Sequence, residues 1–287
     1  MAKKTQKAER LAKNFHRTFI PERRYLGALL KYAADGGAYE IQKIADATGI
    51  PTGASSGKSI PTADYCRGMG LVSLVKATSK DDDPTLALTP FGRTVFLEDK
   101  FFKEPFTQWL AHLRLCNEWR GADTWFYLFC ESTPVFGNRA GAEDVLKWLS
   151  PLIGGKDPET AVSPTIRMYA DEASFADCGA IVREKGKGEL IWTVAPIRAE
   201  FAVGYAAWLA ECMEMAGRGE GQVSIDELET QAGFARISGW SPSDVQQVLE
   251  LLERKRLVEV DRHMHPWLVR FLYPSTTLWI RLYEEFL

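Results

Sequence analysis

The residues best suited to phosphate chemistry lie close to the N-terminus. Residues 1–24 hold eight lysines and arginines against two acidic residues, although the whole chain has a formal net charge of −3. A local excess of positive charge can bind phosphates whatever the total charge. We therefore expect a nucleic-acid-binding arm, whose candidate contact residues are Lys3, Lys4, Lys7, Arg17, Arg23 and Arg24.

One histidine lies inside this basic arm. His16 directly precedes Arg17, and we expect its imidazole to be exposed and able to exchange protons with a bound phosphodiester near neutral pH. A hydrogen-bonded structural role is the more usual one for a single histidine among aromatic residues, so both roles stay open. His112 follows Trp109 at helical spacing, which predicts that His112 lies at the edge of a buried face.

A second group of candidates surrounds the start of a predicted helix. Its members are Ser55, Ser56, Lys58, Ser59, Thr62 and Arg67. Hydroxyl groups and a lysine suit phosphate contact at a helix N-terminus, because the free backbone N–H groups and the helix dipole already favour an anion there. The alternative is a solvated helix start in a protein-binding module. The neighbouring basic arm favours nucleic acid.

The same turn contains a Gly-Lys-Ser sequence of the kind found in nucleotide-binding loops. Such a loop needs G-x-x-x-x-G-K-[ST] directly after a strand. In the segment GASSGKS, Gly53 lies one residue too close to Gly57, a helical segment comes before it, and Pro61 follows. We therefore predict that the turn binds no nucleotide.

Acidic residues and histidines offer possible metal sites. Asp171, Glu172 and Asp177 can in principle hold a divalent ion for phosphodiester chemistry, and the segment DRHMH at 261–265 offers three ligands. An acidic loop and a surface loop are the favoured interpretations of these two segments. Three aspartates at 81–83 occupy a predicted turn, where turn formation and exposure to water explain their presence without any functional role.

The elements that must hold these residues follow the order of a winged helix-turn-helix. Apolar residues at helical spacing predict one helix from Pro21 to Ala33 and a second from Tyr39 to Thr48. A third helix passes through Tyr65 and ends near Gly68–Gly70. Strands at 73–78 and 85–89 then form a hairpin, which is the wing of such a module.

The remainder of the chain is predicted to be mainly helical, with a short strand at 188–194. Its expected core residues are Trp109, Leu110, Leu113 and residues 125–129. Capping residues Ser224 and Ser241 begin two further helices, and their order predicts a second, degenerate helix-turn-helix. The predicted fold class is therefore mainly α, with domains at 1–98, 99–220 and 221–287.

The bulk composition is that of an ordinary globular protein. The five cysteines lie far apart, and we expect them to be reduced and buried. No apolar run approaches the roughly 18 residues of a membrane span, and the first residues lack the apolar stretch of a signal peptide. These features predict a cytoplasmic protein that does not interact with membranes.

Several segments resemble a bacterial family long described only as a domain of unknown function, whose genes occur beside DNA phosphorothioation and phage-defence genes. Residues 14–31 are similar to its opening segment, with His16, Thr18, Phe19 and Arg23 or Arg24 in place. Residues 57–72 resemble its Gly-Lys-led recognition helix. Residues 88–115 are similar to its pattern Leu-Thr-x-x-Gly, Asp, Glu-Pro, Thr-x-Trp-Leu-x-His.

This resemblance implies a role in DNA modification. SspB, a component of a single-stranded phosphorothioation system, looks like a member of the family and is thought to nick DNA so that sulfur can be introduced. By resemblance we expect a DNA nickase that uses Mg²⁺ or another divalent metal and works with sulfur-transfer and ATPase proteins. His16 is its candidate catalytic residue, because its segment adjoins the basic arm. The alternative is a non-catalytic DNA-binding adaptor or transcriptional regulator that recruits partner proteins.

Overall fold

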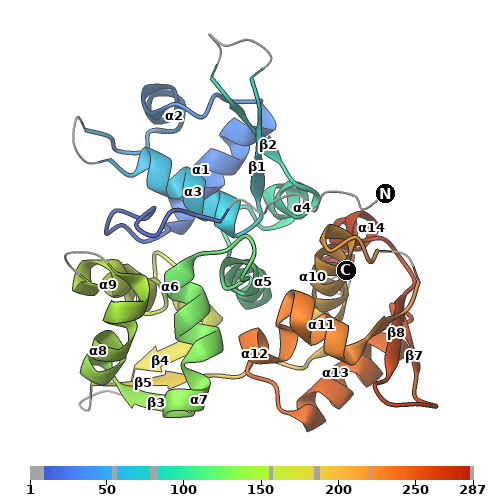
Figure 1. The fold of residues 1–287 in the computed structure, drawn as a ribbon. Helices are drawn as coiled ribbons and strands as arrows, with labels where there is room; N and C mark the ends of the chain where they lie inside the picture. Colours follow the sequence, from blue (N-terminus) through green and yellow to red (C-terminus); the bar gives the residue numbers. More distant parts are fainter. Residues whose placement is uncertain are drawn as a thin grey trace.

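A computed structural model of the chain describes residues 10–53, 57–77, 83–154, 158–183, 188–219 and 221–284, apart from the side chains of residues 158, 159 and 161. Helices dominate these residues, and the strands form small antiparallel sheets (Figure 1). The prediction of a mainly α fold is thus confirmed. In this part of the chain no helix has the length and apolar character needed to cross a membrane.

Three helices and a two-stranded hairpin form the N-terminal part of the fold. They are α1 (Arg23–Ala34), α2 (Ile41–Thr48), α3 (Ser59–Gly68), β1 (Val72–Val75) and β2 (Thr85–Leu88). The strands are antiparallel, with Val72 opposite Leu88, and α1 packs against α2, α3 and β2. The three predicted helices and the predicted hairpin are therefore present.

Local capping explains where two of these helices begin and end. The Glu40 carboxylate accepts hydrogen bonds from the first backbone N–H groups of α2, and Gly49 ends that helix with a φ of 70°. The next helix, α4 (Pro90–Glu98), follows Thr89, whose hydroxyl accepts from the backbone N–H of Gly92. Pro90 suits the first helical turn because it lacks an N–H group.

The middle of the chain builds a second group of helices around a small sheet. Its helices are α5 (Pro105–Leu115), α6 (Asp123–Phe126), α7 (Thr133–Phe136), α8 (Ala142–Ile153) and α9 (Pro158–Met168). Its strands are β3 (Arg139–Gly141), β4 (Ile181–Arg183) and β5 (Glu189–Trp192), with β5 in the centre. Strand β5 falls within the segment predicted as a strand, whereas β3 and β4 were not predicted.

The last third of the chain begins with a long buried helix, α10 (Ala202–Met215). After it come α11 (Ile225–Ala232), α12 (Phe234–Ser238), α13 (Pro242–Arg254) and α14 (Ser275–Ile280), with strands β6 (Val223–Ser224), β7 (Val258–Asp261) and β8 (Leu268–Phe271). Ser224 caps α11 and Ser241 caps α13, each in a capping box. The two predicted caps are confirmed.

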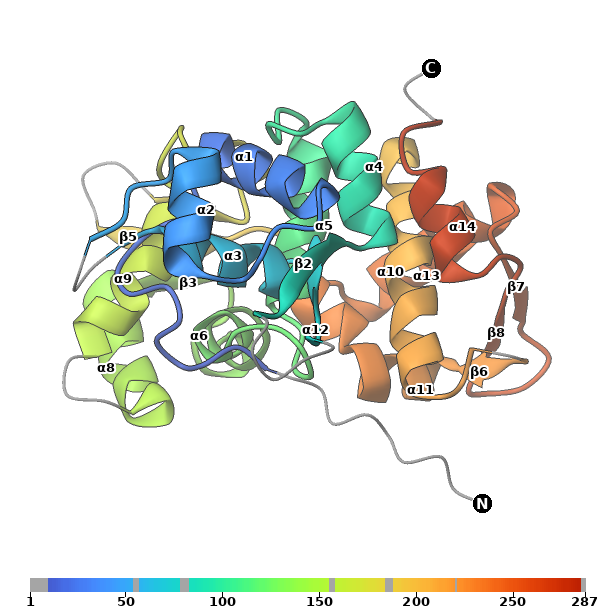
Figure 2. The ribbon, with the colours of Figure 1, turned by 90° about the horizontal axis from the view of Figure 1, so that it is seen from above.

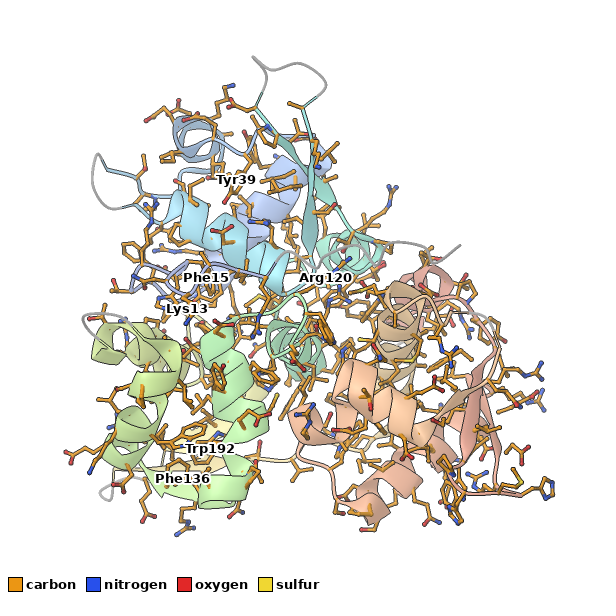
Figure 3. The ribbon with its side chains drawn as sticks, viewed as in Figure 1. Lys13, Phe15, Tyr39, Arg120, Phe136 and Trp192 are labelled. Atoms are coloured by element: carbon orange, nitrogen blue, oxygen red, sulfur yellow. The ribbon has the colours of Figure 1, made fainter. Side chains whose placement is uncertain are left out.

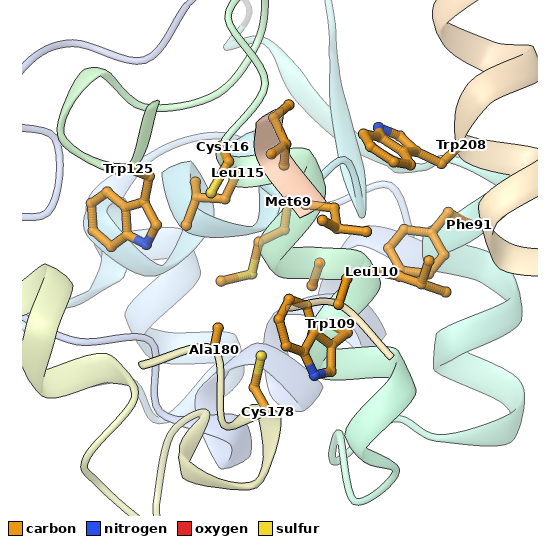
Figure 4. Close-up of a cluster of buried hydrophobic side chains, with 14 of the residues drawn as sticks. Met69, Phe91, Trp109, Leu110, Leu115, Cys116, Trp125, Cys178, Ala180 and Trp208 are labelled. Atoms are coloured by element: carbon orange, nitrogen blue, oxygen red, sulfur yellow. The ribbon is translucent and has the colours of Figure 1, made fainter. Parts of the chain in front are cut away.

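Helix α5 lies in the centre of the molecule. Every residue from Phe106 to Leu115 is buried, and Trp125, Phe91 and Trp208 surround this helix in the core (Figure 4). Trp109, Leu110 and Leu113 are core residues as predicted, and so are four of the five residues at 125–129. All five cysteines are buried and free, again as predicted.

Helix α14, near the C-terminal end of the described residues, contacts a helix from the first third of the sequence. It packs against both α10 and α4 (Figure 2), and the ring of Trp279 lies 4.6 Å from that of Phe91. The buried apolar residues form one continuous cluster that includes residues from all three predicted segments. The domain boundaries after residues 98 and 220 remain predictions.

Candidate nucleic-acid interface

A cluster of cations and aromatic rings covers the start of α1 and α3. The Lys58 ammonium pairs with the Glu22 carboxylate and lies 5.6 Å from the ring centroid of Phe19 and 5.5 Å from that of Tyr25. The Arg24 guanidinium lies 4.4 Å from the Tyr25 centroid. We call these five residues the Lys58 cluster.

The charges of the Lys58 cluster sum to one positive charge. Burial raises the pKa of Glu22, but the hydrogen bonds and charges of Lys58 and Arg24 lower it by more, so this carboxyl stays ionised at neutral pH. Arg24 donates from Nε to Glu22 at 3.0 Å, while its side chain remains 68% exposed. Exposed positive charge beside aromatic faces is typical of surfaces that bind nucleic acids.

Arg23 does not belong to the Lys58 cluster, although it is next to Arg24 in the sequence. Its guanidinium donates to Asp177 at 3.0 Å, to the carbonyl of Phe102 at 3.3 Å and to the carbonyl of Glu172. Arg23 therefore links α1 to the loop that follows α9. Arg17 is exposed, and its φ of 45° lies in the left-handed region. Of the predicted arm residues, only Arg17 and Arg24 thus present exposed charge in the described chain.

Two predicted phosphate-binding hydroxyls lie inside the protein. Ser59 is 1% exposed and Thr62 is 4% exposed, because this face of α3 packs against the core. Neither hydroxyl therefore faces solvent, and their predicted contact with phosphate stays a prediction. Lys3, Lys4, Lys7, Ser55 and Ser56 lie outside the described residues.

Arg67 occupies the opposite end of α3 from Lys58, about 14 Å away along the helix axis at 1.5 Å per residue. Its guanidinium donates to Asp64 at 2.8 Å, and Asp64 also accepts from the hydroxyl of Tyr39 at 2.8 Å. Burial, and then the charge of Asp64, raise the pKa of Tyr39, so the phenol remains a hydrogen-bond donor. Arg67 and Lys58 therefore belong to two separate parts of the surface.

The candidate catalytic residue His16 is fully buried. Its Nδ1 accepts a hydrogen bond from the backbone N–H of Thr18 at 3.2 Å, and its ring lies 5.3 Å from Phe15 and 6.0 Å from Trp125. The expectation that His16 is exposed is therefore wrong. Figure 3 shows Phe15, the chain neighbour of His16, between the N-terminal helices and the helices of the middle segment. These contacts are those of a structural residue, and a catalytic role for His16 remains a prediction.

The described residues contain no group of three or more histidines, cysteines or carboxylates that could hold a metal ion. Asp177 is engaged by Arg23. In the segment 261–265, Asp261 accepts from the backbone N–H of His263, and both histidines are exposed, with the His265 ring stacked on Trp267. The described residues therefore contain no preformed three-ligand metal site, and Mg²⁺ remains a prediction.

Comparison with known proteins relates the chain to SspB at the level of the fold. No family model matches the sequence, and no curated protein matches it either. A magnesium-bound SspB crystal structure superposes with a TM-score of 0.69 and 16% identity over 97% of this chain and 88% of that one. A second SspB crystal structure gives a TM-score of 0.67 and 15% identity with the same coverage. The chain therefore has an SspB-like fold.

Proposed function

We propose that this protein is the DNA-binding component of a phosphorothioate modification and phage-defence system, and that it nicks DNA. The observation that supports this most strongly is the SspB-like fold along almost the whole chain. The similarity of residues 14–31 and 88–115 to the phosphorothioation-linked family points the same way. Within such a system the partners would be DNA, sulfur-transfer proteins and an ATPase.

For the DNA-binding step we propose a winged helix-turn-helix formed by α1–α3 and the β1–β2 hairpin. In such modules the recognition helix enters the major groove by its N-terminal residues. Here that end of α3 carries Lys58, beside the exposed guanidinium of Arg24. The Lys58 cluster would then hold the phosphate backbone, because it supplies a positive charge next to two aromatic faces.

The test of DNA binding is the salt dependence of the affinity for a generic duplex. Each neutralised phosphate contributes about −0.9 to the slope of log K against log salt concentration. Arg24→Gln should reduce the magnitude of this slope by about one. Arg254→Gln is the matched control, because Arg254 is an exposed arginine in the last turn of α13. The same slope in both variants would contradict a role for the Lys58 cluster.

Nicking is tested separately, by relaxation of a supercoiled plasmid with and without Mg²⁺. Metal-dependent appearance of the open circle would support the nickase. Duplex binding without any relaxation would support the alternative, a non-catalytic adaptor or transcriptional regulator. Comparison of the reactions with and without Mg²⁺ also tests the need for the metal, for which the described residues contain no preformed three-ligand site.

A further inference from the structure

An exposed tryptophan follows the central helix α5, in the loop that leads to α6. Trp119 is 46% exposed, although tryptophan is highly buried on average in folded proteins. Its neighbour Arg120 is also exposed and lies beside β1 and α10 (Figure 3). An indole and a guanidinium are thus adjacent in the sequence and both at the surface, outside the Lys58 cluster.

Hydrogen bonds anchor the loop that carries Trp119. Nε1 of Trp119 donates to the carbonyl of Gln231 in α11 at 3.1 Å, which holds one edge of the indole against that helix. Oδ1 of Asn117 accepts from the backbone N–H groups of Trp119 and Arg120, at 2.9 and 3.2 Å. Because the ring is already oriented, little conformational entropy would be lost when a ligand covers its exposed part.

The first described residues of the basic arm lie against this loop. The backbone N–H of Leu11 donates to the carbonyl of Gly121 at 3.2 Å, and Arg10 pairs with Asp123 at 2.8 Å. Lys7 lies outside the described residues, but it is only four residues from Leu11, which limits the distance between their Cα atoms to about 14 Å. The positive charge of the arm is therefore tethered close to the loop.

The acidic side chains around the loop leave Arg120 able to bind a further anion. Glu211 lines the same small cavity as Arg120, but both of its oxygens accept from Arg114. Among the described residues Arg120 forms no ion pair. The loop itself is formally neutral, because Glu118 offsets Arg120, so the excess positive charge here is that of the adjoining arm. A guanidinium in this setting suits a phosphate group.

We propose that Trp119 stacks on an unpaired base of a DNA strand, while Arg120 binds a phosphate next to that base. Bases in a duplex are stacked on each other, so only an unpaired base can offer its face to an exposed indole. Aromatic rings beside positive charge are the combination with which proteins hold single strands of any sequence. This inference rests on the proposed DNA-binding function, and it specifies a substrate with unpaired nucleotides, such as those at a frayed strand end.

The test measures the affinity of the full-length protein for a labelled oligothymidylate, with a duplex and an oligomer of abasic residues as the other two ligands. Trp119→Ala should weaken oligothymidylate binding about five- to 150-fold, because one stacked base contributes about 1–3 kcal/mol. Trp119→Phe also loses the hydrogen bond to Gln231 but keeps an aromatic face, so it should recover most of the affinity. Neither variant should change binding to the abasic oligomer.

Two further variants separate stacking from charge. Phe101→Ala is the matched control, because Phe101 is an aromatic residue of similar exposure, 47%, in the segment after α4. This variant should bind oligothymidylate as tightly as the unaltered protein. Arg120→Gln should reduce the slope of log K against log salt concentration by about 0.7 in magnitude, which is the contribution of one phosphate of a single strand.

The proposal is overturned if Trp119→Ala binds oligothymidylate as tightly as the unaltered protein, as expected of a tryptophan that contacts a partner protein instead. It is also overturned if Trp119→Phe is as weak as Trp119→Ala, since the lost bond to Gln231 would then explain both, or if the abasic oligomer binds as tightly as oligothymidylate. Duplex binding without oligothymidylate binding would overturn this inference alone. Failure of both ligands to bind would overturn the proposed DNA-binding function as well.

Discussion

Nδ1 of His112 and the hydroxyl oxygen of Tyr169 lie 2.6 Å apart in the core, where both residues are buried. Nε1 of Trp125 donates to the same hydroxyl at 3.1 Å. Because an indole can only donate, the Tyr169 proton is free to bind Nδ1 of a neutral His112. Burial lowers the pKa of His112 to about 3, which keeps this imidazole neutral.

This histidine makes the stability of the protein sensitive to acid. An unfolded histidine titrates near pH 6.5, so between pH 6.5 and about 3 the unfolded chain binds a proton that the folded chain does not. The free energy of unfolding should therefore fall by about 1.6 kcal/mol from this residue alone between pH 6.5 and 5. In His112→Gln, urea unfolding at these two pH values should show a smaller difference. An equal difference in both proteins would contradict the low pKa.

His16→Ala should destabilise the protein, because the side chain is buried between Phe15 and Trp125. We expect a loss of about 1–3 kcal/mol in urea unfolding. Arg17→Ala is the control, since this exposed neighbour should change stability by less than about 0.5 kcal/mol. If His16→Ala is as stable as the unaltered protein and yet loses plasmid nicking, the residue is catalytic after all.

Glu211→Ala should be among the most damaging single substitutions. It removes the partner of Arg114, whose side chain is 10% exposed, and it also removes the acceptor of the Trp279 indole. Breaking a buried pair in this way costs about 3–5 kcal/mol. Glu259→Ala provides the comparison, because the Glu259–Arg270 pair is exposed and should contribute less than about 1 kcal/mol. Similar losses in urea unfolding would show that burial of the Arg114 pair has no effect.

The acidic segment at 81–83 should keep the hairpin away from DNA. Asp83 pairs with Lys43 of α2 at 2.8 Å, while Asp81 and Asp82 lie outside the described residues. Replacing Asp81 and Asp82 with Lys should strengthen duplex binding at low salt, because two repulsive charges become attractive ones. Weaker binding by this variant would indicate that the carboxylates serve another role, such as metal binding.

Lys3, Lys4 and Lys7 are sequence candidates for phosphate contact. Replacing all three with Ala should flatten the salt dependence of duplex binding if each neutralises a phosphate. The slope is measured in the same titrations as that of Arg24→Gln. An unchanged slope would remove the arm from the interface and leave the Lys58 cluster as its remaining candidate.

Much of the fold was predictable because its signals are local. Gly49 marks the end of one helix and Ser241 the start of another by their own chemistry, and the helical spacing of apolar residues in the sequence is enough to predict α1. The short strands β3 and β4 were not predicted. Each is three residues long, and each is held by pairing with β5, a partner that is distant in sequence for β3.

The candidate site was harder to predict, because exposure depends on packing between distant segments. His16, Ser59 and Thr62 belong to polar or basic segments, yet each is buried against residues far away in the chain. Trp119 and Arg120 carry no local motif, and only the fold brings the basic arm to their loop. A single sequence records the residue types at such a site but not their proximity.

The position of Trp279 also has a consequence for the synthesis of the protein. This residue covers Phe91 in the core, but it is translated roughly 190 residues later. At about 5–20 residues per second, ribosomes need on the order of 10–40 s to make that stretch. During this interval the nascent α4 keeps an apolar edge uncovered. The N-terminal helices therefore complete their packing only after translation of α14, and until then the apolar surface around Phe91 lacks its cover.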